Sequence, residues 1–235
     1  MAAATLPRNP EDAHLRFGLL LLTFSTGLID AVSYIGLHVF TANMTGNILI
    51  MAFAAVGVPG LSVTRSGTSL AAFLFGALIG GRLNVALSAK SRTRWVAAAM
   101  SGEALLVIAA AVMAGVAGPA TSSEYLHYSI IVLLALAMGI RNAMVRKLAV
   151  PDLTTTVLTL TVTGIAADSR LAGGTSPRIS TRIASVTMMF LGAAVGAILL
   201  RYGMAAPLGV CAAITVLALA AILGRKGNGH VADAA

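Results

Sequence analysis

Residues 17–39, FGLLLLTFSTGLIDAVSYIGLHV, are the stretch that decides the fold class. As a helix they would be roughly 35 Å long, enough to cross the hydrocarbon core of a bilayer, which is about 30 Å thick. Their only ionisable acid or base side chains are Asp30 and His38. Five later runs have a similar length and character: residues 68–87, 95–117, 126–145, 183–201 and 207–223. The sequence therefore predicts an all-α integral membrane protein with six transmembrane helices.

The composition favours lipid over water as the solvent of this chain. Of its 235 residues, 58% are hydrophobic and 10% are charged, whereas soluble domains carry about 25% charged residues. The net charge of +8 comes from Lys and Arg in short connectors, with no basic stripe interleaved with aromatic residues. We therefore expect the lipid bilayer as the partner and no nucleic-acid binding. The single cysteine, Cys211, lies inside an apolar run, so an intrachain disulfide is excluded.

Two apolar segments, residues 43–58 and 154–167, are too short for a full crossing, since each would span only about 20–25 Å. Cytoplasmic connectors collect Lys and Arg, so these residues discriminate between topologies. With Arg141 set aside because it lies within a run, eight crossings leave eight basic residues inside and seven outside. Six crossings leave thirteen inside and only Arg65 and Arg201 outside. The charge pattern favours six crossings with two re-entrant or broken short helices, and both termini on the cytoplasmic side of the membrane.

Similar motifs recur in the same order in the two halves of the chain. Gly76 and Gly80 correspond to Gly192 and Gly196 at an offset of 116, and GLIDA at 27–31 corresponds to GIRNA at an offset of 112. Small residues spaced by four let helices approach closely, so we expect these four glycines at helix contacts. Three crossings in each copy predict an inverted 3+3 repeat. The predicted parts are a polar cytoplasmic tail (1–14), a first copy (15–118), a second copy (126–223) and a cytoplasmic tail (224–235).

A polar cluster surrounds the first short segment. Asp30 lies near mid-depth of the first crossing, where a carboxylate is costly and is a candidate functional residue, unless it is a structural acid paired inside the bundle. The other candidates for substrate binding are Thr41, Asn43, Thr45 and Asn47. An unwound stretch that leads into a half-helix can present N–H groups to an anion or a dipole. An ordinary helix cap with interhelical hydrogen bonds explains the same residues.

The second copy contributes its own candidates for substrate binding, which are Arg141, Asn142, Thr155 and Thr159. Threonines spaced by four share one helix face, which suits a solute path and equally suits helix packing. Arg141 either pairs with Asp30 near the midplane or extends its side chain toward the cytoplasm.

Glu103 is the other acid within a predicted crossing. It is a candidate proton relay, and the alternative is a hydrogen-bonded structural acid. The sequence has no metal-ligand spacing, no Ser/His/Asp grouping, no nucleophile elbow and no phosphate-binding loop followed by Lys-Ser or Lys-Thr. We therefore expect no enzyme activity, no metal and no cofactor.

Residues 27–31, 40–47 (FTANMTGN) and 142–143, with the Thr-rich stretch after them, resemble the YoaK family of bacterial inner-membrane proteins, domain of unknown function 1275. The resemblance covers roughly residues 15–223. It implies a six-helix membrane protein without an established activity. This chain departs from the family at Arg141, where the family often has Gln, and at Leu160, where it often has Gly.

The sequence supports two main hypotheses about function. The first is a small-solute transporter or permease with a midplane site between two inverted repeats. The second is a non-transporting membrane component, such as an assembly factor or a sensor of envelope stress, and an intramembrane lipid-modifying enzyme is a weaker third. The identity of the solute and the formation of a homo-oligomer stay open at this level.

Overall fold

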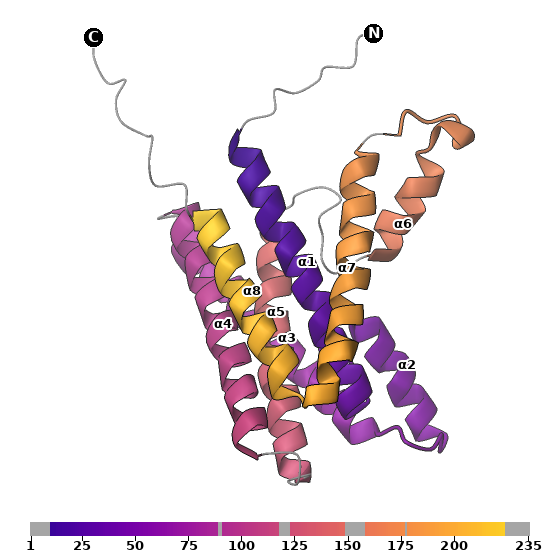
Figure 1. The fold of residues 1–235 in the computed structure, drawn as a ribbon, viewed down its shortest axis with the longest axis vertical. Helices are drawn as coiled ribbons and strands as arrows, with labels where there is room; N and C mark the ends of the chain where they lie inside the picture. The colour runs from indigo at the N-terminus through magenta and orange to yellow at the C-terminus, as the bar shows by residue number, and fades with distance from the viewer. Residues whose placement is uncertain (1–9, 89–90, 118–122, 149–157, 177, 224–235) are drawn as a thin grey trace.

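The computed structural model describes residues 10–88, 91–117, 123–148, 158–176 and 178–223, and these ranges form helices joined by short connections. Figure 1 shows their arrangement. The α-helices are α1 (Pro10–Leu37), α2 (Met44–Ala55), α3 (Val63–Ser88), α4 (Arg92–Ala117), α5 (Glu124–Leu148), α6 (Leu158–Ala167), α7 (Ile179–Leu199) and α8 (Ala205–Leu223). Two 3-10 turns are η1 (Arg170–Ala172) and η2 (Leu200–Tyr202).

Six of the described helices are long and apolar enough to cross a membrane, and α2 and α6 are shorter apolar helices. The predicted all-α, multi-pass membrane fold is thereby confirmed. The helix bounds differ in detail from the predicted apolar runs, because a helix can continue beyond the apolar residues that cross the membrane. Thus α1 begins at Pro10, inside the stretch predicted as a tail, and proline suits the first position of a helix. Of the second short segment, predicted as residues 154–167, the structure describes residues 158–167, and these form α6.

The two most buried long helices are α1 and α5, whereas α3 and α7 are the most exposed. α1 packs along α7 and α8, α5 packs along α3 and α4, and α4 contacts α8. In Figure 1 the start of α1 and the end of α8 lie at the same, upper end of the molecule. That arrangement requires an even number of crossings, as six crossings do.

The core consists of two apolar clusters with a polar layer between them. One cluster, nearer the C-terminal end of α1 and called the lower cluster, includes Leu28 of α1, Val107 of α4 and Leu134 of α5. The other, called the upper cluster, includes Leu22 of α1 and Met100 of α4. Each of the four helices that build both clusters carries buried polar side chains near the boundary between them: Ser25, Thr26, Glu103, Arg141 and Thr215. The fold therefore buries charge at mid-depth, where unpaired charge is costly.

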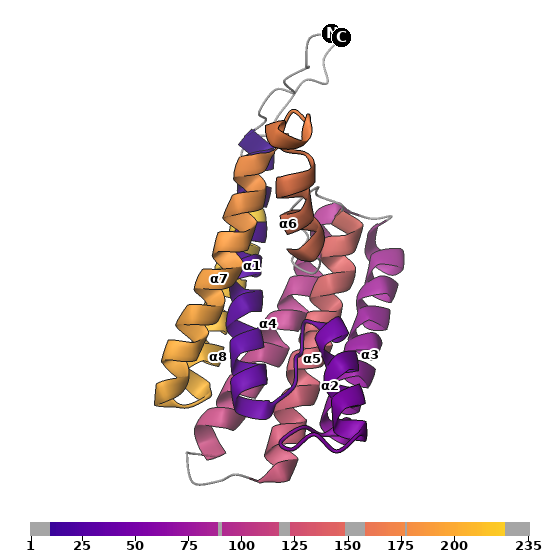
Figure 2. The same ribbon diagram turned by 90° about the vertical axis from the view of Figure 1, so that its right-hand side faces the viewer.

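The short helices α2 and α6 lie one above the other on the same side of the bundle, as Figures 1 and 2 both show. α2 packs on α3, and α6 packs on α7. The turn from α2 to α3 lies at the lower end of the molecule, and η1, which follows α6, lies at the upper end. The N-terminal ends of α2 and α6 consequently face each other near half height.

Candidate functional site

The connection between α1 and α2 is held by the side-chain amide of Asn47. Its Oδ1 accepts a hydrogen bond from Phe40 N at 2.8 Å, and its Nδ2 donates to Phe40 O. Ser69 Oγ, on α3, also donates to Phe40 O at 2.7 Å and accepts from Asn47 Nδ2 at 3.1 Å. These bonds satisfy backbone groups that would be costly to leave unpaired in an apolar environment. Asn47, a predicted ligand residue, thus fixes the backbone path into α2.

Asp30 and Asn43 hold the same connection from either side. Asp30 Oδ1 accepts from Ala42 N at 3.3 Å. Asn43 is the N-cap of α2, and its Oδ1 accepts from the backbone N–H three residues later at 3.2 Å. Thr45 is exposed on the first turn of α2. Thr41 is fully buried, and its Oγ1 has no hydrogen-bond partner among the residues that the structure describes.

The polar residues of α6 divide between two faces of the helix. Thr159 is exposed, whereas Thr161 is buried. Thr155 lies outside the described residues, so the predicted threonine stripe is visible only in part. Asn142, on α5, donates to the Met138 carbonyl of its own helix at 2.8 Å. The structure therefore does not join Asn142 to the cluster around α2.

α6 is fastened to α7 at its C-terminal end. Arg182 Nη1 donates to Gly164 O and pairs with Asp168 Oδ2 at 2.7 Å. The Gly164 carbonyl lies in the last turn of α6 and also accepts a hydrogen bond from Asp168 N at 3.3 Å. A cation at a helix C-terminus also interacts favourably with the helix dipole. The ion pair and the cap together hold the short helix in place.

Arg141 is the centre of the polar layer. Its guanidinium is 1% exposed and pairs with Glu103 of α4, which is also fully buried. It also donates to four groups of α1 and α8: Leu22 O at 3.1 Å, Thr26 Oγ1 at 3.0 Å, Ser25 Oγ at 2.9 Å and Thr215 Oγ1 at 3.3 Å. Four helices therefore meet at one guanidinium, whose planar set of donors suits several acceptors at once.

The predicted ion pair between Asp30 and Arg141 is wrong, because Arg141 pairs with Glu103 instead. Arg141 reaches α1 at Ser25 and Thr26, and Asp30 lies a further turn, about 6 Å, along the helix. The alternative, in which Arg141 extends to the cytoplasm, also fails because the side chain is buried. Glu103 is the partner of a buried cation, and its predicted role as a proton relay stays a prediction.

Sequence reasoning missed the partners of Arg141 on α1 and α8, as well as Ser69. The signal was weak but present, since Ser25-Thr26 and Thr215 lie near the middle of long apolar runs. Polar side chains at such depth hydrogen-bond between helices. What the sequence could not supply is the rotation of each helix about its axis, which decides which polar residues face one another.

The predicted packing glycines lie where helices approach most closely. A Cβ at Gly76 would collide with the backbone carbonyl of Leu136 on α5, and one at Gly192 with that of Phe24 on α1. Gly80 lies against Ile140 of α5, and Gly196 lies against α1. In the described part of the chain, no three His, Cys, Asp or Glu side chains gather as a metal site would require. The absence of metals, cofactors and enzyme activity stays an expectation.

Six long apolar helices around a buried polar layer define a multi-pass α-helical membrane protein. The sequence profile of the family described as "Protein of unknown function (DUF1275)" matches residues 18–221, so the chain belongs to that family. It is similar to the UPF0700 transmembrane protein YoaK of Bacillus subtilis (strain 168), with 31% identity over 155 residues. That match covers 64% of this chain and 65% of the relative. The chain therefore spans less than two thirds of the length of YoaK. No solved structure matches the chain.

Proposed function

We propose that this protein is a small-solute transporter or permease of a bacterial inner membrane, with its solute path between the N-terminal ends of α2 and α6. The observation that carries the proposal is the pair of half-length helices that point at each other near mid-depth (Figure 2). A chain that only anchors itself in lipid needs no such helices. Exposed N–H groups and the positive ends of two helix dipoles favour an anion or a strongly dipolar solute.

Exposed polar side chains at the N-terminal ends of α2 and α6 support this path. Thr45 and Asn43 occupy the first turn and the cap of α2 and are both exposed. Thr159 occupies the corresponding part of α6 and is exposed as well. In this proposal these three side chains line the path, while Asn47 and Asp30 hold the backbone behind it and Thr41 is buried beside it.

The inverted 3+3 repeat belongs to the same proposal, and the glycine contacts support it. Gly27 lies against the carbonyl of Met189, and Gly139 lies against the carbonyl of Phe73. The glycines differ by 112 positions (139 − 27) and their contacts by 116 (189 − 73), the two offsets found between the copies. Exchanging α1 with α5 and α3 with α7 thus exchanges one contact for the other. The pairs of α1 with α8 and of α5 with α4 obey the same exchange.

The exchange described above relates two groups of helices, and in this proposal they move against each other. One group contains α1, α6, α7 and α8, and the other contains α2, α3, α4 and α5. They meet mainly where α4 contacts α8 and where Arg141 of α5 bonds to α1. Rocking of one group against the other around a fixed site is the usual mode of transporters built from inverted repeats. The Arg141 layer lies at the pivot of such a motion.

The orientation in the membrane is tested separately from transport. With six crossings and cytoplasmic termini, Ser91, between α3 and α4, lies inside, and Ser123, just before α5, lies outside. Single cysteines at these positions, in a chain with Cys211→Ala, are exposed to a membrane-impermeant maleimide on intact cells. Ser123→Cys reacts and Ser91→Cys does not. The reverse pattern, or labelling of both, rejects this orientation.

Transport itself is tested in proteoliposomes by light scattering during swelling in isotonic glycerol, urea, sodium formate or sodium nitrate. We expect faster swelling than in empty liposomes for at least one of these solutes. Thr45→Trp and Thr159→Trp obstruct the path and should each remove the difference. Thr93→Trp, at an exposed threonine near the start of α4, is the matched control and should retain it. Equal swelling by wild type and Thr45→Trp contradicts the proposed path.

A second candidate function, a non-transporting membrane component, is favoured by one specific observation. Asp30 and Asn47, two of the predicted ligand residues, form hydrogen bonds with the backbone of the α1–α2 connection. If Asn43→Ala and Thr45→Val lower the thermal midpoint and leave swelling rates unchanged, this segment is structural and the second candidate gains. In both candidates the bilayer is the partner, and we assign no enzymatic step, cofactor, metal or nucleic acid. Whether copies associate is left to measurement.

A further inference from the structure

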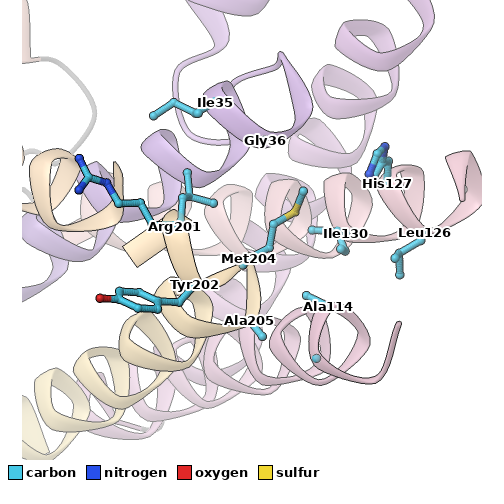
Figure 3. Close-up of a pocket in the computed structure, with 13 residues that line it drawn as sticks. Ile35, Gly36, Ala114, Leu126, His127, Ile130, Arg201, Tyr202, Met204 and Ala205 are labelled. Carbon is cyan, nitrogen blue, oxygen red and sulfur yellow. The ribbon is translucent and has the colours of Figure 1, made fainter. Parts of the chain in front are cut away.

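A cavity of about 670 Å³ opens at the lower end of the bundle, away from α2 and α6. It lies among the ends of α1 and α4, the start of α5, and the η2–α8 corner, as Figure 3 shows. This volume falls within the range of pockets that bind small organic molecules, roughly 300–1,000 Å³. The cavity is separate from the path proposed above, because α2 and α6 contribute none of its lining residues.

The walls of the cavity are mainly apolar. Figure 3 places Met204 near its centre, with Ile130 beside it, Leu126 and Ala114 on one side and Ile35 on another. Methionine is flexible and polarisable, so it adapts to ligands of different shape. The lower apolar cluster closes the inner end of the cavity. Between Gly36 in the cavity wall and Thr26 in the Arg141 layer, α1 rises by roughly 15 Å.

The polar groups of the cavity are basic or neutral. Arg201 and Tyr202 lie on one side, and His127 lies on the other (Figure 3). Arg201 is exposed and makes no ion pair within the described residues. No acidic side chain is among the lining residues, and the nearby Glu124 pairs with Arg65 at 3.9 Å.

His127 contributes an imidazole to the wall of the cavity. Its Nδ1 is buried and has no partner in the described part of the chain, but a buried atom offers no surface to a ligand. The exposed guanidinium of Arg201 is therefore the group to which the polar head of a ligand can bind.

We infer that this cavity binds a small amphipathic anion, with an aliphatic or aromatic body and a carboxylate or phosphate-type head. The body fills the space around Met204 and Ile130, and the head lies at the exposed guanidinium of Arg201. Charge-assisted hydrogen bonds from a guanidinium to such a head are stronger than neutral ones. A free organic anion and an anionic lipid of the outer leaflet share this chemistry.

The test uses purified protein in phosphatidylcholine nanodiscs, with octanoate as the probe and octan-1-ol as its uncharged counterpart. Unfolding on heating is followed by the reaction of the buried Cys211 with a fluorogenic maleimide. Octanoate at ten times its dissociation constant should raise the wild-type midpoint by roughly 3–5 °C, and octan-1-ol should not. In phosphatidylglycerol nanodiscs, a raised midpoint to which octanoate adds nothing identifies the lipid as the source of the anion.

Three variants distinguish binding of the probe in this cavity from a general effect of the amphiphile on the bilayer. Arg201→Gln changes an exposed residue and should abolish the preference for octanoate over octan-1-ol. Ala114→Phe and Met204→Trp fill the cavity by different routes and should abolish both the octanoate and the phosphatidylglycerol responses. The inference is overturned if wild type responds to neither anion, if octan-1-ol matches octanoate, or if Arg201→Gln responds as wild type does.

Discussion

α2 and α6 are short apolar helices of the same kind, yet the protein fastens them at opposite ends. α2 is held at its N-terminal end, where Asn47 and Ser69 bind the Phe40 backbone. α6 is held at its C-terminal end, where Arg182 binds the Gly164 carbonyl and Asp168. Two short helices of similar length are therefore held in the bundle by two different sets of polar contacts.

The residues at corresponding positions explain this difference. In the proposed repeat Thr45 corresponds to Thr159, so that Asn47 corresponds to Thr161 at the same offset of 114, and Ser69 corresponds to Ser185 at the offset of 116. Thr161 and Ser185 are both buried, but the Ser185 hydroxyl has no partner among the described residues. A threonine carries its donor and its acceptor on one oxygen, whereas the separate nitrogen and oxygen of an amide can bind the C=O and the N–H of one residue side by side. Thr161 therefore cannot form the contact that Asn47 forms, and α6 is fastened through Arg182.

The largest effect is expected where four helices share one contact, in the Arg141 layer. Glu103→Gln leaves the guanidinium buried without its counter-charge, which should destabilise the protein by about 3–5 kcal/mol. The double change Glu103→Gln with Arg141→Gln should recover much of the loss. Thermal unfolding in nanodiscs, followed by circular dichroism, measures both.

Glu124→Gln is the matched control for the Arg141 layer. Glu124 pairs with Arg65 at 3.9 Å on the surface, and its side chain is 69% exposed. Surface pairs contribute about 0–1 kcal/mol. If Glu124→Gln lowers the free energy of unfolding as much as Glu103→Gln does, burial of the Arg141 layer does not increase the contribution of its ion pair to stability.

The next effect tests whether the copies are equivalent in their packing. Gly76→Ala and Gly192→Ala each place a methyl group against a backbone carbonyl of the neighbouring helix. Overpacking of this kind should cost about 1–3 kcal/mol, and by a similar amount at both sites. Gly81→Ala is the control, because a Cβ there meets nothing within 4 Å. A loss at only one of the two glycines would contradict the proposed equivalence of the two helix contacts.

A third prediction concerns the N-terminal fastening of α2. Asn47→Ala leaves the Phe40 backbone without its amide partner and should cost about 1–3 kcal/mol. Thr161→Val, at the corresponding place in α6, keeps the shape of the side chain and should cost much less. Thermal midpoints of the two variants compare them directly. Equal losses would mean that α6 has a clasp equivalent to that of α2.

The smallest and most local effect concerns the C-terminal fastening of α6. Arg182→Gln removes the ion pair with Asp168 and weakens the cap on Gly164. Hydrogen exchange measured by mass spectrometry should become faster in residues 158–167 and remain unchanged in residues 44–55. Asn47→Ala should give the converse pattern. Faster exchange in both helices after either change would show that α2 and α6 open as one unit.

The sequence by itself determined the class of this protein and the number of long helices. Runs of about twenty apolar residues have one stable solution in lipid, because every backbone N–H and C=O must be paired within a helix. The two short segments were also visible, since their length and their polar ends distinguish them from full crossings. The glycine pairs identified close contacts, because only small side chains permit such approach between backbones.

The tertiary structure alone decided which polar residues meet. Asp30, Glu103 and Arg141 were all recognisable as buried charges, but their pairing depends on how each helix is rotated and shifted along its axis. Those two variables are set by the packing of many apolar side chains at once, which no single motif encodes. For that reason Arg141 bonds to Glu103 and to Ser25 and Thr26, while Asp30, one turn away, holds a backbone N–H.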